Sequence, residues 1–134
     1  MRKLLIILLT CSVYCISACK KGSSVSPTLF GKWELRRSYG GFLGHDSVYK
    51  AGNGNILQFN SDSTYKRFEA KRLTATGVFH IRNYYNPGPN AVASVMILFD
   101  NSTYGDAFSM KGTTMTIGTT VTDGIALDYQ KISN

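Results

Sequence analysis

The sequence has little cysteine, and what it has is confined to one end. Its three cysteines are Cys11, Cys15 and Cys19, and none follows them. A disulfide framework of the kind that staples small secreted domains is therefore excluded from the rest of the chain. A zinc site built on cysteine pairs is excluded there as well. The folded part must be stabilised by its hydrophobic core.

Residues suited to catalysis are also scarce. The only histidines are His45 and His80, and the eight carboxylates are scattered, with no pair at a spacing that suggests acid–base chemistry. The chain has no Gly-x-Ser-x-Gly elbow, phosphate-binding loop or EF-hand loop. The glycine-rich segment 40–44 precedes no helix and is expected to be a mobile loop. We expect no enzyme activity, no metal ion and no cofactor, and both histidines in solvent.

One long uncharged run occurs, at the start of the chain. Arg2 and Lys3 precede residues 4–18, which carry no charge. A basic start followed by an apolar run is typical of a secretory signal, and the run is shorter than the roughly 20 residues that span a bilayer. An uncleaved signal anchor is the alternative. As a cleaved signal, this segment is expected to form a helix that stands apart from the folded domain.

The end of this run, Ile16-Ser17-Ala18-Cys19, resembles the lipobox of bacterial lipoproteins. The resemblance implies that residues 1–18 are a signal peptide and that Cys19 becomes the acylated N-terminus. Three acyl chains, palmitate among them, would exceed the two signals needed for stable membrane anchoring. Residues 19–27 then form a flexible Gly/Ser tether. The implied location is the cell envelope, lipid-anchored in the outer membrane and facing the periplasm.

The chain is basic, with a formal net charge of +7, and the loss of Arg2 and Lys3 would leave +5. Such a charge favours anionic lipids or ligands and does not by itself indicate nucleic-acid binding. The densest basic run is 66–72, which is either the solvated face of a strand or a patch for anionic headgroups or a sugar acid. Asp46-Ser47-Val48 and Asp62-Ser63-Thr64 resemble short sequons for O-glycosylation.

Residues 28–134 show short alternating runs separated by Gly, Asn, Asp and Pro, with no sustained helical period, and this pattern predicts an all-β domain. Expected strands are 32–39, 47–51, 56–60, 64–70, 74–83, 91–100, 107–111, 114–119 and 125–132. Turns are expected at 60–63, 86–90, 111–113 and 123–124. Short links favour sequential antiparallel neighbours, and closure predicts an up-and-down barrel of about eight strands.

The period-2 alternation selects an inward face, because successive side chains of a strand point to opposite sides. The inward set comprises Leu35, Leu57, Phe59, Phe79, Ile81, Phe108, Met110, Ile117 and Leu127. These side chains either fill the barrel or line a ligand cavity. The segment Ala91–Phe99 is apolar on both faces, which predicts that a helix, a loop or another subunit covers its outer face.

Three further motifs resemble the short lipocalin-like lipoproteins of the bacterial envelope. They are Gly31-Lys32-Trp33, the segment Phe59-Asn60-Ser61-Asp62-Ser63-Thr64-Tyr65, and the closing Asp128-Tyr129-Gln130-Lys131. The resemblance implies a barrel that binds a small apolar or amphipathic molecule. The T-D-Y motif of lipocalins and a clear Arg after the last strand are absent. Lys131 is expected to take that Arg's place over Trp33 and close one end of the barrel.

Two functions are therefore expected. The first is a membrane-anchored binding protein whose ligand cavity is lined by Leu35, Leu57, Phe59, Phe79, Ile81, Phe108, Met110 and Leu127. The alternative is an interaction module with a filled barrel, which binds a protein or surface partner or a second copy through Ala91–Phe99.

Overall fold

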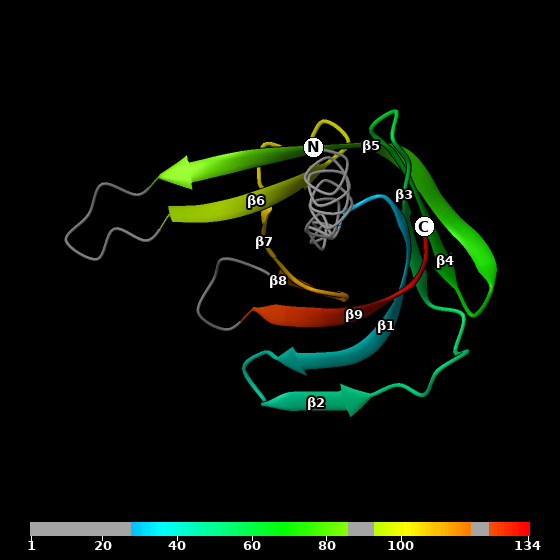
Figure 1. Ribbon diagram of the computed structural model, residues 1–134. Helices are drawn as coiled ribbons and strands as arrows, with labels where there is room; N and C mark the ends of the chain where they lie inside the picture. Colours follow the sequence, from blue (N-terminus) through cyan, green and yellow to red (C-terminus); the bar gives the residue numbers. More distant parts are fainter. Residues whose placement is uncertain (1–27, 86–92, 119–123) are drawn as a thin grey trace, which may run out of the picture.

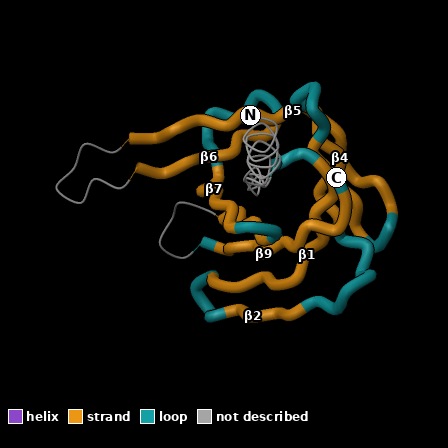
Figure 2. Tube along the Cα trace, in the orientation of Figure 1, coloured by secondary structure: helices purple, strands orange, loops and turns teal. Residues whose placement is uncertain are grey.

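The computed structural model describes residues 28–85, 93–118 and 124–134 (Figure 1). The strands are β1 (Gly31–Gly40), β2 (His45–Val48), β3 (Ile56–Phe59), β4 (Thr64–Glu69), β5 (Arg72–Tyr85), β6 (Ala93–Phe99), β7 (Asp106–Lys111), β8 (Thr114–Gly118) and β9 (Ile125–Ser133). The described residues form strands, turns and loops (Figure 2). The expected signal peptide 1–18, Cys19 and the tether 19–27 lie outside the described residues.

None of the described residues belongs to a helix long and apolar enough to cross a membrane.

The strands form one antiparallel sheet that closes on itself. β1 pairs with β9, with Trp33 opposite Lys131 and Gly40 opposite Ile125. This pairing joins β1 and β3–β9 into an eight-stranded barrel, and closure leaves those strands without a free edge (Figure 1). The predicted fold class is confirmed: the protein is an all-β, up-and-down antiparallel barrel of the lipocalin-like type.

Strand β2 is an addition to the barrel. The first half of β1, Gly31–Glu34, pairs with β3, and its second half, Arg37–Gly40, pairs with β2. The segment 40–44, expected to be a mobile loop, forms a tight turn in which the Gly44 N–H donates to the Gly41 carbonyl at 3.0 Å. Gly41 and Gly44 both have positive φ, which lets the chain reverse there.

Because the strands alternate in direction, the links gather at two ends. The Trp33 end carries the start of β1, the turns at 60–63 and 112–113, and the end of β9. The other end, here called the mouth, carries the turns at 41–44 and 70–71 and the loop 49–55. The loop 100–105 instead begins beside the 60–63 turn, because the Asp100 N–H donates to the Val78 carbonyl and the Phe79 N–H donates to the Ser63 carbonyl. The predicted turns at 60–63 and 111–113 are confirmed, while the turn at 86–90 and Asp123 lie outside the described residues.

The barrel core is rich in aromatic side chains. Its buried members are Trp33, Leu57, Phe59, Tyr65, Phe79, Ile97, Met115, Ile117 and Tyr129. Phe59 meets Phe79 edge-on at 4.8 Å between centroids, and Tyr65 meets Phe99 in the same way at 4.8 Å. Full burial of one large apolar side chain stabilises a fold by about 1.5–3 kcal/mol, so this cluster provides much of the driving force.

Ile81 does not join this core, which corrects one member of the predicted inward set. Its side chain is 41% exposed, although it is paired with Ile97, which is fully buried. The pairing of β5 with β4 ends at Val78, whereas β5 continues with β6 alone. The two strands run on together past β4 (Figure 1), so Ile81 has no β4 side chain beside it.

A loop, one of the three covers expected for the outer face of Ala91–Phe99, covers that face at Leu98. Leu98 points outward and is only 5% exposed. Gly105 packs so closely on Leu98 that an added Cβ would meet the leucine side chain at 3.1 Å. Asp100 fixes this loop, because its Oδ2 accepts from the Tyr65 hydroxyl at 3.0 Å. Ala91 and Val92 lie outside the described residues.

Candidate functional site

The Trp33 end of the barrel is covered by the chain itself. Trp33 is fully buried, and its Nε1 donates to the Leu29 carbonyl at 2.7 Å. The Lys131 amine lies 5.4 Å from the centre of the indole ring, within the roughly 6 Å of a cation–π contact. The same amine donates to the Thr28 carbonyl at 2.8 Å. The contact expected from the sequence is thus present, and Lys131 with Thr28 and Leu29 covers the indole.

The predicted cavity residues are brought together, with one exception. Leu57, Phe59 and Phe79 belong to the buried cluster, as does Ile117 of the predicted inward set. Leu35, Phe108, Met110 and Leu127 are partly buried and pack against that cluster. Ile81 alone stands apart, for the reason given above. The deep aromatic members pack on one another, and the partly buried leucines lie nearer the mouth.

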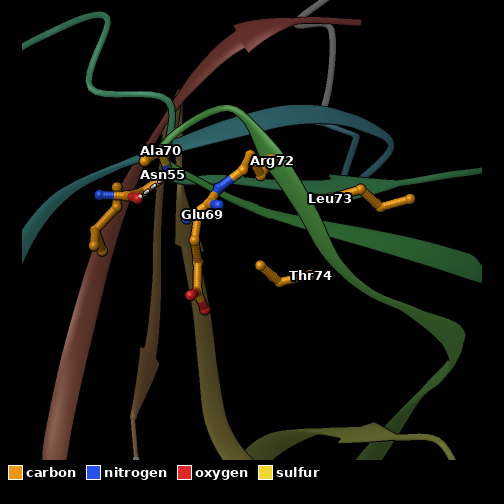
Figure 3. Close-up of a pocket in the computed structure, with 7 residues that line it drawn as sticks. Asn55, Glu69, Ala70, Arg72, Leu73 and Thr74 are labelled. Atoms are coloured by element: carbon orange, nitrogen blue, oxygen red, sulfur yellow. Dashed lines mark hydrogen bonds between the residues drawn. The ribbon is translucent and has the colours of Figure 1, made fainter.

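A pocket of about 660 Å³ opens at the mouth, beside the β4–β5 turn (Figure 3). Its lining residues are Leu35, Asn55, Glu69, Ala70, Arg72, Leu73 and Thr74. Asn55 holds the loop 49–55 to the turn, because its Oδ1 accepts from the Ala70 N–H at 3.0 Å. Leu35 also packs against the buried cluster, so the pocket borders the barrel core.

The wall beside this pocket carries a charge that faces inward. Tyr65, Arg67 and Glu69 alternate along β4 and therefore share one face. Tyr65 is in the core, and Arg67 is paired with Leu57, which is also in the core. The Arg67 guanidinium lies 5.7 Å from the centre of the Phe99 ring. The basic run 66–72 is thus divided: Lys66 points outward and Arg67 inward.

Two further polar side chains join this region, Asp106 from β7 and Tyr129 from β9. Asp106 is paired with the buried Ile97, and partial burial raises the pKa of its carboxyl, with Arg67 opposing that effect. Burial also raises the pKa of the Tyr129 hydroxyl, which feels the charges of Arg67, Asp106 and Glu69. We call Arg67, Glu69, Asp106 and Tyr129 the mouth quartet. It offers cationic and phenolic donors together with carboxylate acceptors.

Sequence reasoning missed the mouth quartet as a site. The alternation of side chains along the last strand correctly predicted that Tyr129 points inward with Leu127. The same rule was not applied to β4, where it predicts that Arg67 and Glu69 point inward. Asp106 fell just outside the strand expected at 107–111, so its face was not assigned. A charged residue on an inward position is the signal that could have found all three.

The histidines remain in solvent, since both His45 and His80 are exposed. Within the described ranges, no three His, Cys, Asp or Glu side chains are grouped so that they could hold a metal ion.

Comparison with protein-family models, with curated proteins and with solved structures finds no match for this chain.

Proposed function

We propose that this protein is a binding protein of the bacterial envelope, anchored through lipid on Cys19, whose barrel takes up a small amphipathic molecule at its mouth. The observation that carries the proposal is the pocket of about 660 Å³, which is of ligand size and borders the core through Leu35. The covered Trp33 end supports entry from the opposite side.

The test of binding is native mass spectrometry of the full-length protein purified from its host. An added mass that dissociates on activation supports the proposal, and a spectrum of unliganded protein alone contradicts it. Leu35→Phe should narrow the pocket and reduce the bound fraction. Val48→Phe is the control, because Val48 is 80% exposed and lies on β2, outside the pocket lining.

The anchor is tested separately. Cys19→Ser should release the protein from the membrane fraction or leave it as an unprocessed precursor, because no sulfur remains to carry lipid. Unchanged membrane association and unchanged mass would contradict a lipoprotein and would leave the binding proposal standing.

A second candidate function, an interaction module, is favoured by the β1–β2 turn. Phe42 and Leu43 at its tip are 86% and 92% exposed. Two adjacent large apolar side chains in solvent are typical of a contact surface. Phe42→Ser with Leu43→Ser should abolish capture of a protein partner or self-association, with pocket binding unchanged. If the double variant behaves as the parent in sedimentation and in partner capture, this candidate is dismissed.

A further inference from the structure

The barrel interior near the mouth has two unlike walls. Arg67 and Glu69 on β4 and Asp106 on β7 make one side polar, with Phe99 of β6 between them. On the other side, formed by β8, β9 and β1, the corresponding inward side chains are Ile117, Leu127 and Leu35. A molecule that enters here meets charge along one edge and hydrocarbon along the other.

Among the described residues, the polar wall has no ion-pair partner. The salt bridges of the described residues join Glu34 to Arg36 and Arg37 to Asp46. Arg67 and Asp106 influence one another electrostatically, yet they do not approach to ion-pair distance. The side chains of the mouth quartet form no hydrogen bond with other described residues, which leaves their donors and acceptors without a partner in that part of the chain.

From this arrangement we propose, resting on the proposed function, that the mouth quartet binds an uncharged, hydroxylated headgroup of an amphiphile. A hydroxyl group both accepts and donates, so it can accept from Arg67 and Tyr129 while donating to Asp106 or Glu69. The alkyl part of the same molecule then lies against Leu35, Leu127 and Ile117.

Charge decides against the two alternatives. A carboxylate headgroup would pair with Arg67 but would stand beside Asp106 and Glu69, and like charges repel. An ammonium headgroup would satisfy the carboxylates but would stand beside Arg67. A neutral polyol avoids both penalties.

The experiment uses calorimetry to measure how the full chain binds three eight-carbon probes at neutral pH. The probes are octyl glucoside, octanoate and octylammonium. Octyl glucoside is expected to bind at least about tenfold more tightly than either charged probe, because only the glucoside satisfies both signs of the wall. Octanoate or octylammonium as the tightest ligand would overturn the proposal.

Two variants test the role of each charge. Asp106→Asn should improve octanoate binding and weaken glucoside binding, while Arg67→Gln should improve octylammonium binding and weaken glucoside binding. The matched control is Lys66→Gln, which removes a charge from the exposed outer face of the same strand and should change none of the affinities. Affinities that shift in Lys66→Gln as much as in Arg67→Gln would show a surface-charge effect and overturn the site.

The outcomes separate the two proposals. If octyl glucoside, octanoate and octylammonium bind equally well and the variants change nothing, the headgroup site is wrong while a binding barrel stands. If no probe binds to protein that is folded by circular dichroism and carries no ligand by native mass spectrometry, the binding function fails together with the site.

Discussion

At the scale of single residues, Glu34 shows how a buried charge can organise a loop. The Glu34 side chain is 5% exposed, and its oxygens accept from the Gly52 and Gly54 N–H groups at 3.0 and 3.2 Å. Arg36 lies 2.7 Å away as its ion-pair partner. Burial would raise the pKa of the Glu34 carboxyl, but these partners outweigh it and the pKa lies below its ordinary value of 4.5.

Glu34→Gln is expected to lower the free energy of unfolding by about 1–3 kcal/mol at neutral pH, because a charged acceptor of buried N–H groups is lost. The lowered pKa means that the ionised carboxyl stabilises the fold above pH 4.5, and that this contribution is lost as the pH falls through the folded-state pKa. Urea unfolding at a series of pH values should therefore show the two proteins converging in acid. A constant difference at every pH would contradict this role.

Gly31, the first residue of the Gly31-Lys32-Trp33 motif, is required for a different reason. Its φ is 120°, and an added Cβ would collide with the Ser133 carbonyl oxygen of β9. The motif thus begins with glycine because β1 and β9 meet there with no room for a side chain.

Gly31→Ala should therefore destabilise the barrel more than Gly112→Ala does. Gly112 also has positive φ, 60°, but nothing lies within 4 Å of its added Cβ. The Gly112→Ala control carries only the cost of a left-handed backbone, about 1–2 kcal/mol. The difference in thermal unfolding therefore measures the collision with Ser133 together with the higher backbone cost of φ 120°. Equal losses of stability in the two variants would mean that β9 can move away at Ser133 without an energetic cost.

At the scale of strands, alternation in the sequence predicted most of the architecture. All nine strands were expected near their observed places, because turn residues and period-2 patterns are local signals. The strand at 47–51 is instead His45–Val48, and β1 divides its pairing between β2 and β3. Local patterns do not encode which strand pairs with which half of a long neighbour, since that depends on the closure of the whole sheet.

The same limit explains Ile81 and the mouth quartet. Because Phe79 and Ile81 are two residues apart on one strand, the alternation predicted that both point inward. Burial also requires a neighbouring strand, and the pairing with β4 ends before Ile81. The candidate cavity residues were chosen because they are apolar. This choice left out Arg67, Glu69 and Asp106, although the alternation predicts that they point inward. The composition of a strand does not show which end of the barrel is open, where charged side chains can point inward.

The pair Phe79 and Ile81 provides a matched test. Phe79→Ala should lower the free energy of unfolding by about 3–5 kcal/mol, because it leaves a cavity against Phe59 in the core. Ile81→Ala, two residues further along the same face, should cost under about 1 kcal/mol, since its side chain is 41% exposed. Chemical denaturation of both variants checks this, and similar losses would show that the extension of β5 is packed in solution.

At the scale of the whole molecule, the barrel has unlike ends. Trp33, covered by Lys131 and Leu29, belongs to an aromatic core, while the mouth exposes a pocket and a charged wall. The sequence contains one tryptophan, so its fluorescence reports on the Trp33 end alone. This separates events at the mouth from events in the core.

Binding at the mouth is accordingly expected to leave tryptophan emission unchanged while raising the melting temperature. Octyl glucoside at 100 times its dissociation constant would stabilise the native state by about 2.7 kcal/mol, since only the folded barrel presents the site. Trp33 is fully buried, so its emission should stay blue-shifted until the barrel unfolds. The measurement is a thermal scan followed by tryptophan fluorescence with and without the probe. A spectral shift at temperatures well below unfolding would place the ligand beside Trp33 and contradict entry at the mouth. A higher melting temperature with an unchanged emission spectrum is the result expected for a barrel that is covered at the Trp33 end and open at the mouth.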